Sequence, residues 1–144
     1  MESKIYDPLR RCFVKRSPEE MVRQGVLLSM EDLGFPKSLV GVEKSLKELM
    51  PEAPEALPDR RVDIVCFSAG YFKPLLIVEC KAYPTFLREA LLQVMGYNHF
   101  LQAAFIAVAT PGEIVMGWYD PLEKGYRFIE RLLSYKELME AAYG

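Results

Sequence analysis

Apolar runs along the chain have the lengths and periods of β-strands. Runs 62–67 and 74–78 are separated by Ser68-Ala69-Gly70-Tyr71, a turn sequence suited to an antiparallel hairpin. A third run, 104–109, is rich in aliphatic residues and precedes Pro111-Gly112, which predicts a buried central strand. Because this run follows a predicted helix, we expect it to lie parallel to an earlier strand.

Helix signals lie between and around these strands. Ser17 is the expected N-cap of the first helix, with Pro18 at the first helical position and Glu20 completing a capping box. Thr85 is the expected cap of the next helix and Ser134 is the expected start of the last. We expect helices at about 17–33, 85–101 and 134–142, and further strands at 39–43, 114–119 and 126–129.

The order of these elements is α-β-β-β-α-β, followed by a C-terminal extension. Helices that alternate with strands of a partly parallel sheet predict an α/β fold with a mixed central sheet. The proline-rich stretch 51–58 is too short and too central to divide the chain, so we interpret it as a loop. We expect one domain over 1–144, with a core at about 17–110 and an extension at about 111–144.

Composition limits the classes of function. The 144 residues are 51% apolar and 26% charged, with a net charge of −2. This slightly negative net charge creates no general electrostatic field that attracts polyanions. A nucleic acid would therefore be held by local basic patches or by a bound cation. The three cysteines have no metal-site spacing and are interpreted as reduced thiols. Early charges and short apolar runs predict a cytoplasmic protein with no membrane partner.

The most informative motif is Glu79-Cys80-Lys81, which closes the second apolar run. Strand side chains alternate between faces, so Glu79 and Lys81 share one face. Asp63 lies sixteen positions earlier, the separation expected for neighbours in an adjacent hairpin. Two carboxylates and the backbone carbonyl of Cys80 are oxygen ligands of the kind that Mg²⁺ or Mn²⁺ takes. The sequence therefore predicts a metal site here, with Lys81 placed to orient or deprotonate a water.

Salt bridges offer a structural alternative for the same residues. Glu79 and Lys81 would form an ion pair at the strand end, while Asp63 would pair with Arg60 or Arg61. An isolated Glu-x-Lys motif is more often structural than catalytic, so this reading stays open at this point.

Helical residues extend the candidate site. Gln93 and Tyr97 are four residues apart and share one helix face, where they could bind a phosphate or hold the lysine. Glu19 lies on the apolar stripe of the first helix, whereas Glu20 has a capping role, so Glu19 is the expected inward-pointing acid. The alternative is that both acids only favour the helix N-terminus electrostatically.

Together these motifs carry a family resemblance. Pro58-Asp59 through Asp63, then Glu79-Cys80-Lys81, then Gln93-x-x-x-Tyr97 resemble the PD-(D/E)xK nuclease superfamily, in its branch with the Gln-x-x-x-Tyr helix. Segments 18–24, 34–37 and 42–43 are similar to the N-terminal nuclease domain of type I restriction enzyme R subunits and its stand-alone relatives.

The resemblance implies a restriction-endonuclease-like fold that hydrolyses DNA with Mg²⁺, or with Mn²⁺ as a substitute. Asp59 competes with Asp63 for the role of the first acid, because Asp59 forms the literal Pro-Asp pair. The implied roles are metal binding by Asp63, Glu79 and the Cys80 carbonyl, water activation by Lys81, assistance through a water from Glu19, and support of substrate or lysine by Gln93 and Tyr97.

The resemblance also implies partners and leaves an alternative. DNA is the expected substrate, with RNA still open; other restriction or repair subunits are expected partners, and a homodimer stays open. No Walker phosphate loop occurs, so this chain carries no translocating motor. The alternative is a catalytically inactive module that binds nucleic acid or assembles with a complex. Two basic groups could contact DNA: Arg10, Arg11, Lys15 and Arg16, and Arg60 with Arg61.

Overall fold

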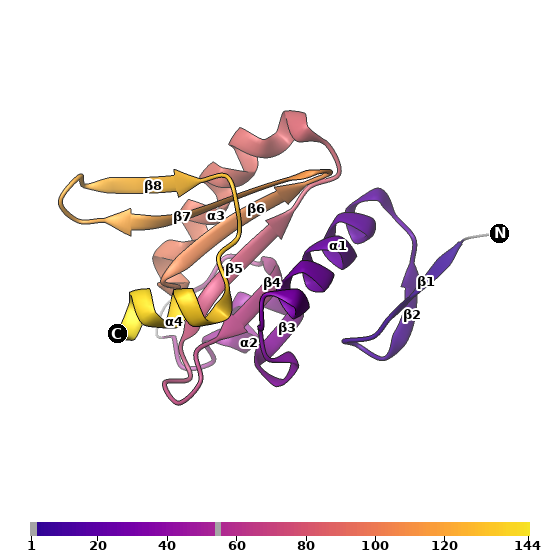
Figure 1. Ribbon diagram of the computed structural model, residues 1–144, viewed down its shortest axis with the longest axis horizontal. Helices are drawn as coiled ribbons and strands as arrows, with labels where there is room; N and C mark the ends of the chain where they lie inside the picture. Colours follow the sequence, from indigo (N-terminus) through magenta and orange to yellow (C-terminus); the bar gives the residue numbers. More distant parts are fainter. Residues whose placement is uncertain (1–2, 54–55) are drawn as a thin grey trace.

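A mixed β-sheet with helices on both faces forms the centre of the protein (Figure 1). The structure, a computed structural model, describes residues 3–53 and 56–144, and in these residues the sheet has six strands in the order β3-β4-β5-β6-β7-β8. Its strands are β3 (Val40–Ser45), β4 (Arg61–Phe67), β5 (Pro74–Cys80), β6 (Phe105–Thr110), β7 (Glu113–Asp120) and β8 (Gly125–Ile129). The predicted α/β class is confirmed.

Strand directions follow the predicted connections. β4 and β5 form an antiparallel hairpin, whereas β6 lies parallel to β5 because a helix carries the chain back between them. The remaining neighbours in this sheet are antiparallel. The helices are α1 (Pro18–Asp32), α2 (Leu46–Leu49), α3 (Leu87–Leu101) and α4 (Tyr135–Tyr143), with short 3₁₀ turns η1 (Lys37–Leu39) and η2 (Pro84–Phe86).

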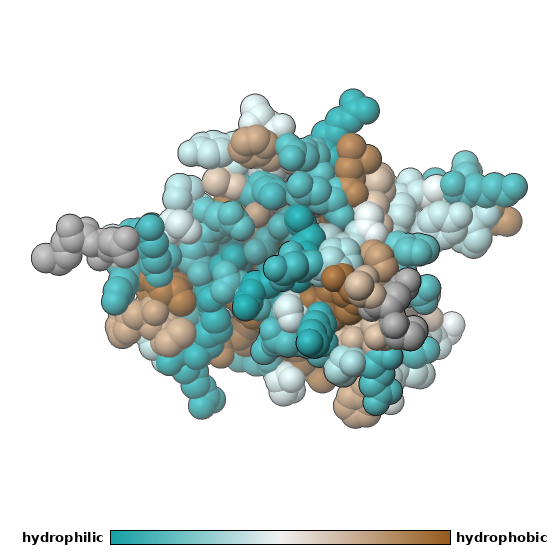
Figure 2. All heavy atoms as spheres, turned by 180° about the vertical axis from the view of Figure 1, so that it is seen from behind, coloured by the Kyte–Doolittle hydropathy of each residue, from teal (hydrophilic) through white to brown (hydrophobic). Residues whose placement is uncertain are grey.

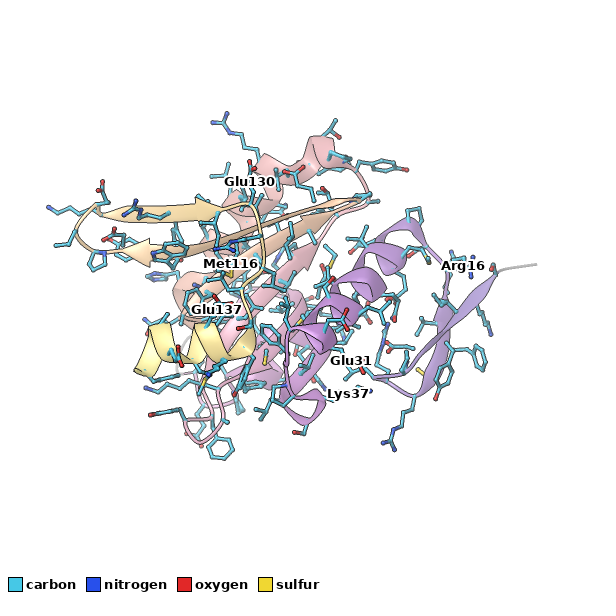
Figure 3. All side chains as sticks on the ribbon, viewed as in Figure 1. Arg16, Glu31, Lys37, Met116, Glu130 and Glu137 are labelled. Carbon is cyan, nitrogen blue, oxygen red and sulfur yellow. The ribbon has the colours of Figure 1, made fainter. Side chains whose placement is uncertain are left out.

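Two apolar layers hold the helices on the sheet. One face packs against α1 and α4, and the other against α2 and α3. Met116 of β7 is fully buried in the first layer (Figure 3). Along β5, Leu76 and Val78 contact the first layer and Ile77 the second. This two-sided burial explains why the strand is a continuous apolar run rather than an alternating one.

The N-terminal residues form a second, two-stranded sheet that the pattern did not predict. Strands β1 (Lys4–Asp7) and β2 (Cys12–Lys15) pair as an antiparallel hairpin beside α1 (Figure 1). Most of their residues are exposed, so the apolar alternation that marks a half-buried strand is missing. The short helix α2 was also not predicted; Ser45 begins it with a complete capping box.

The predicted helix starts at Ser17 and Ser134 are confirmed, and the predicted cap at Thr85 is wrong. Ser17 accepts a hydrogen bond from the backbone N–H of Glu20, and Ser134 heads a complete capping box. The predicted box at Ser17 is only half formed, because the Glu20 carboxylate binds arginines instead. The Thr85 cap is wrong, because Thr85 lies within η2 and α3 begins two residues later at Leu87.

The cysteines are free thiols, as the spacing indicated. Cys12 is exposed, whereas Cys66 and Cys80 are buried in strands, and burial raises the pKa of the Cys66 thiol to about 12. Among the described residues, every helix falls short of the length and apolar character that crossing a membrane requires.

Candidate active site

Asp63 of β4 and Glu79 of β5 meet at one end of the hairpin. Ile64 pairs with Val78, and the same register places Asp63 opposite Glu79. Residues directly opposite on neighbouring strands present side chains to the same side of the sheet. Both acids are buried, at 7% and 5% exposure. The structure therefore brings together the two carboxylates that the hairpin predicted.

The charge of Asp63 affects the neighbouring carboxyl of Glu79. Burial, and then repulsion from the Asp63 charge, raise the pKa of Glu79 to about 7. The hydroxyl of Tyr97 donates to Glu79 Oε2 at 2.8 Å, which lowers this pKa without cancelling the rise. Asp63 Oδ2 accepts a hydrogen bond from the backbone N–H of Cys80 at 2.7 Å. Each carboxylate is thus held in place by a hydrogen bond, but the surrounding groups do not fully offset the negative charge of the pair.

Arg23 of α1 is the cation that binds Asp63. Its Nη2 lies 2.8 Å from Asp63 Oδ1, and its Nη1 lies 2.8 Å from Glu20 Oε1. Burial would lower the pKa of Arg23, but the hydrogen bond and charge of Asp63, with the charges of Glu20 and Glu43, raise it above its usual value. Arg60 and Arg61 were the expected partners of Asp63, and the structure assigns that contact to Arg23 instead.

A third acid continues the row across the sheet. Val42 pairs with Ile64 and Lys44 with Val62, which places Glu43 of β3 beside Asp63. Glu43 Oε1 lies 3.3 Å from Arg23 Nη2. Its φ of 52° is in the left-handed region, which residues other than glycine rarely adopt. Carboxylates from three neighbouring strands, β3, β4 and β5, therefore lie next to one another in the part of the site nearest α1.

Ion pairs continue from Arg23 to the N-terminal hairpin. Glu20 Oε1 also lies 2.6 Å from Arg10 Nη2, and Arg10 Nε pairs with Asp7. We call this series, Asp7, Arg10, Glu20, Arg23 and Asp63, the acid–arginine chain. Arg10 is therefore engaged inside the protein, which corrects its assignment to a basic group for DNA.

Glu20, rather than Glu19, is the buried acid of α1. Glu20 is 5% exposed, whereas the side chain of Glu19 is 47% exposed. The expectation that Glu19 points inward is wrong in this respect, because the arginines draw Glu20 into the interior. Glu19 still lies near the site: burial, and then the charge of Asp63, raise its pKa, while Lys81 lowers it.

Gln93 and Tyr97 of α3 share one face, as their spacing predicted, but they hold other partners than expected. Tyr97 binds Glu79, and Gln93 Oε1 accepts a hydrogen bond from Arg60 Nη2 at 2.9 Å. The Arg60 guanidinium carbon lies 5.3 Å from the centre of the Tyr97 ring. The helix therefore positions the Glu79 carboxylate and the Arg60 guanidinium.

Lys81 and Asp59 lie at the edge of the site. The Lys81 backbone N–H donates to Ala109 O at 2.9 Å, and the side chain, on the strand end next to Glu79, is near enough to Glu19 to lower its pKa. Asp59 is exposed on the loop before β4, whereas Asp63 is buried beside Glu79. Geometry thus favours Asp63 over Asp59 as the first acid.

The donor set fits a magnesium ion in part. Mg²⁺ is often bound by one or two carboxylates, with waters and substrate phosphates completing its shell. Asp63 and Glu79 supply two carboxylates whose mutual repulsion a divalent cation would relieve. Within residues 3–53 and 56–144, no group of three or more His, Cys, Asp or Glu side chains is arranged to hold a metal. A cation here would therefore need further ligands besides these side chains, such as a backbone carbonyl, waters or phosphate oxygens.

Other charged residues lie outside this arrangement. Arg11, Lys15 and Arg16 are exposed on the N-terminal hairpin and the link to α1 (Figure 3 labels Arg16). His99 is exposed near the end of α3 and its ring meets that of Phe100. Seen from behind, the middle of the molecule is predominantly hydrophilic, with hydrophobic side chains in separate patches (Figure 2).

Comparison with known proteins gives the family. Residues 18–132 match the family described as type I restriction enzyme R protein N terminus (HSDR_N), and the chain belongs to that family. The fold resembles a fragment of a chain assigned as an HsdR subunit of a type I restriction enzyme from Vibrio vulnificus YJ016. That match has a TM-score of 0.57 and 17% sequence identity, and it covers 81% of this chain and 23% of that one. No curated protein matches the chain significantly.

Proposed function

We propose that this chain is a metal-dependent nuclease domain of the PD-(D/E)xK type that hydrolyses phosphodiester bonds of DNA. The observation that carries the proposal is the convergence of Asp63 and Glu79, buried and side by side, with Lys81 on the same strand end. Membership of the restriction R-protein N-terminal family supports a nuclease-related role. The proposal includes a cytoplasmic location and restriction-complex subunits as partners.

Asp63 and Glu79 would hold Mg²⁺, with Mn²⁺ as a substitute and the Cys80 carbonyl as a further oxygen ligand. A bound divalent ion supplies Lewis-acid stabilisation of a phosphate and lowers the pKa of a coordinated water. Tyr97 fixes the carboxylate of Glu79, and Cys80 N–H fixes that of Asp63. Lys81 would orient the attacking water or take its proton, and Glu19 would assist through a water at the outer edge.

One observation favours a second candidate, a module that binds DNA or partner subunits without cutting. Arg23 already compensates the charge of Asp63 through a 2.8 Å ion pair, so part of the attraction for a metal is used inside the protein. This candidate predicts DNA or partner binding that is insensitive to a chelator.

Cleavage of plasmid and linear DNA with Mg²⁺ or Mn²⁺ tests the proposal. We expect wild type to cut, Lys81→Ala to lose at least about 100-fold in rate, the lower end for general acid–base groups, and a chelator to abolish cutting. Lys136→Ala, which removes an exposed lysine of α4, is the matched control and should cut like wild type.

Equal cutting by wild type and Lys81→Ala contradicts the role of the lysine. Absence of cutting in both, together with chelator-insensitive DNA binding, favours the binding module instead.

A further inference from the structure

Arg60 lies at the open side of the carboxylate pair. It precedes β4, and its Nη2 is 3.9 Å from Glu79 Oε1. The Arg60 side chain is 34% exposed, whereas that of Glu79 is 7% exposed. The guanidinium therefore lies next to a buried acid while it stays partly exposed to solvent, on the α3 side of the site.

Two residues of α3 hold this guanidinium in place. Gln93 Oε1 accepts its Nη2–H at 2.9 Å, and the guanidinium lies over the Tyr97 ring at 5.3 Å. A stacked and hydrogen-bonded arginine keeps a planar fork of donors in one orientation. Holding a partly exposed arginine in this way limits the entropy that it would lose on binding a ligand.

Its donors are not used up by the protein. The 3.9 Å separation of Arg60 Nη2 from Glu79 Oε1 is longer than a hydrogen bond. Arg60 Nε is buried without a hydrogen-bond partner among the described residues, as is Nε of Arg23, so a ligand would bind the Nη donors of the partly exposed guanidinium. An arginine placed only to neutralise Glu79 would approach it more closely, so its orientation calls for another acceptor.

We propose that Arg60 is a phosphate-binding residue of this site, held by Gln93 and Tyr97 so that its guanidinium binds a non-bridging oxygen of a DNA phosphodiester next to the carboxylate pair. This assignment rests on the proposed nuclease function and adds a residue outside the acid and lysine motif. Guanidinium and phosphate match in geometry and charge, and the contact would anchor the backbone without reading bases.

DNA binding separates this assignment from catalysis. Affinity for a short duplex is measured by fluorescence anisotropy with Mg²⁺ at several salt concentrations, in a Lys81→Ala background that prevents cutting. We expect Arg60→Ala to weaken binding about 10- to 100-fold, the range of a hydrogen bond to a charged group. The slope of log affinity against log salt should fall by about 1, as for one lost phosphate contact. Arg60→Lys should keep the slope but recover only part of the affinity.

Arg127→Ala is the matched control, because it removes the same charge from exposed β8 and should leave affinity and slope close to those of wild type. An Arg60→Ala slope equal to that of wild type, or equal losses for Arg60→Ala and Arg127→Ala, overturns the assignment. If Arg60→Ala does not fold, Arg60→Lys is the deciding variant. A DNA affinity equal to that of wild type would mean that a positive charge alone is sufficient, and it would refute an oriented guanidinium contact.

The nuclease proposal can fail separately. Wild type that binds DNA through Arg60 but does not cut refutes hydrolysis and keeps the phosphate contact. Wild type that cuts, with binding unaffected at Arg60, refutes the contact and keeps hydrolysis. Wild type without any DNA binding overturns both.

Discussion

The two carboxylates of the candidate site each have an arginine beside them, and the surroundings of the two arginines differ. Arg23 is 6% exposed and makes close ion pairs with Asp63, Glu20 and Glu43. Arg60 is 34% exposed, is bound by a neutral glutamine, and remains 3.9 Å from Glu79. Arg23 is paired with three carboxylates, whereas Arg60 is held by a neutral amide and an aromatic ring and is more exposed.

This difference separates a structural role from a ligand-binding one. A buried arginine with several acid partners cannot leave them without exposing unpaired charges in a low-dielectric interior. A half-buried arginine held by a neutral amide and an aromatic ring can exchange water for an anion at little cost. The α1 side of the site therefore contributes to the stability of the fold, and the proposed phosphate contact lies on the α3 side.

The largest effect is expected from breaking the α1 side. Arg23→Met leaves Glu20 and Asp63 as buried carboxylates with one cation fewer, so we expect the free energy of unfolding to fall by about 3–5 kcal/mol. Arg60→Met should cost less than about 1 kcal/mol, because the ion pair of Arg60 with Glu79 is long and partly exposed. Urea unfolding at neutral pH measures both. Equal losses would remove the distinction between the two arginines.

A smaller effect is expected at the hydroxyl that holds Glu79. Tyr97→Phe removes the 2.8 Å hydrogen bond to a buried carboxylate, which should cost about 1.5–3 kcal/mol at pH about 8. The loss should shrink at pH about 5, where Glu79 is largely protonated.

Tyr126→Phe is the control for Tyr97→Phe, because the Tyr126 hydroxyl accepts a hydrogen bond from the neutral amide of Asn98. Its cost should be about 1 kcal/mol and should not change with pH. A cost of Tyr97→Phe that is likewise independent of pH would contradict the assignment of the raised pKa to Glu79.

The raised pKa of Glu79 gives the third prediction. Because the folded state raises this pKa from 4.5 to about 7, it binds more protons than the unfolded state between these values, and this contribution to stability is lost as pH rises through that window. A Mg²⁺ ion bound to Glu79 as proposed would compete with the proton, so the apparent Mg²⁺ affinity should rise about tenfold per pH unit up to about 7 and then level off.

Calorimetric titration with Mg²⁺ at pH about 6 and about 8 measures the difference in affinity. Glu79→Gln should abolish the pH dependence of the magnesium affinity. Magnesium binding that is equally strong at both pH values would show that Glu79 is not a ligand.

The smallest effect is expected at Glu19. Its half-exposed side chain lies 4.0 Å from Arg23, so Glu19→Gln should change the free energy of unfolding by less than about 0.5 kcal/mol. Glu20→Gln, one residue along the same helix turn, should cost about 1.5–3 kcal/mol, because Glu20 binds two arginines. Thermal or urea unfolding of the pair checks this ranking, and a reversed order would contradict the assignment of Glu20 as the buried acid.

Local pattern was sufficient to predict the carboxylate pair. Asp63 and Glu79 belong to two apolar runs joined by turn residues, so their sequence separation indicated that they lie close together. Their exact register also depends on the connection 68–73 and on the bulge between Cys66 and Phe67, which the pattern did not predict. The face shared by Gln93 and Tyr97 follows from helical period in the same way.

Partners from distant elements could not be predicted in this way. Arg23 and Asp63 are 40 positions apart, and their contact depends on how α1 lies against the sheet. The choice between Glu19 and Glu20 depends on Arg10, which reaches Glu20 only because the exposed strands β1 and β2 fold back beside α1. Neither helical period nor apolar pattern contains that information. The sequence did contain one indication of this contact: Glu20 and Arg23 are three residues apart, a spacing typical of an ion pair along a helix.

The acid–arginine chain begins ahead of the region that matches the family, which starts at residue 18. Shortening the protein to that homologous segment would delete Asp7 and Arg10 while leaving Glu20 and Arg23 behind. Trimming the protein to residues 18–132 would therefore remove the ion pair of Arg10 with Glu20, which binds Arg23, the partner of Asp63 in β4. The unit that holds Asp63 in place is thus larger than the segment that matches the family.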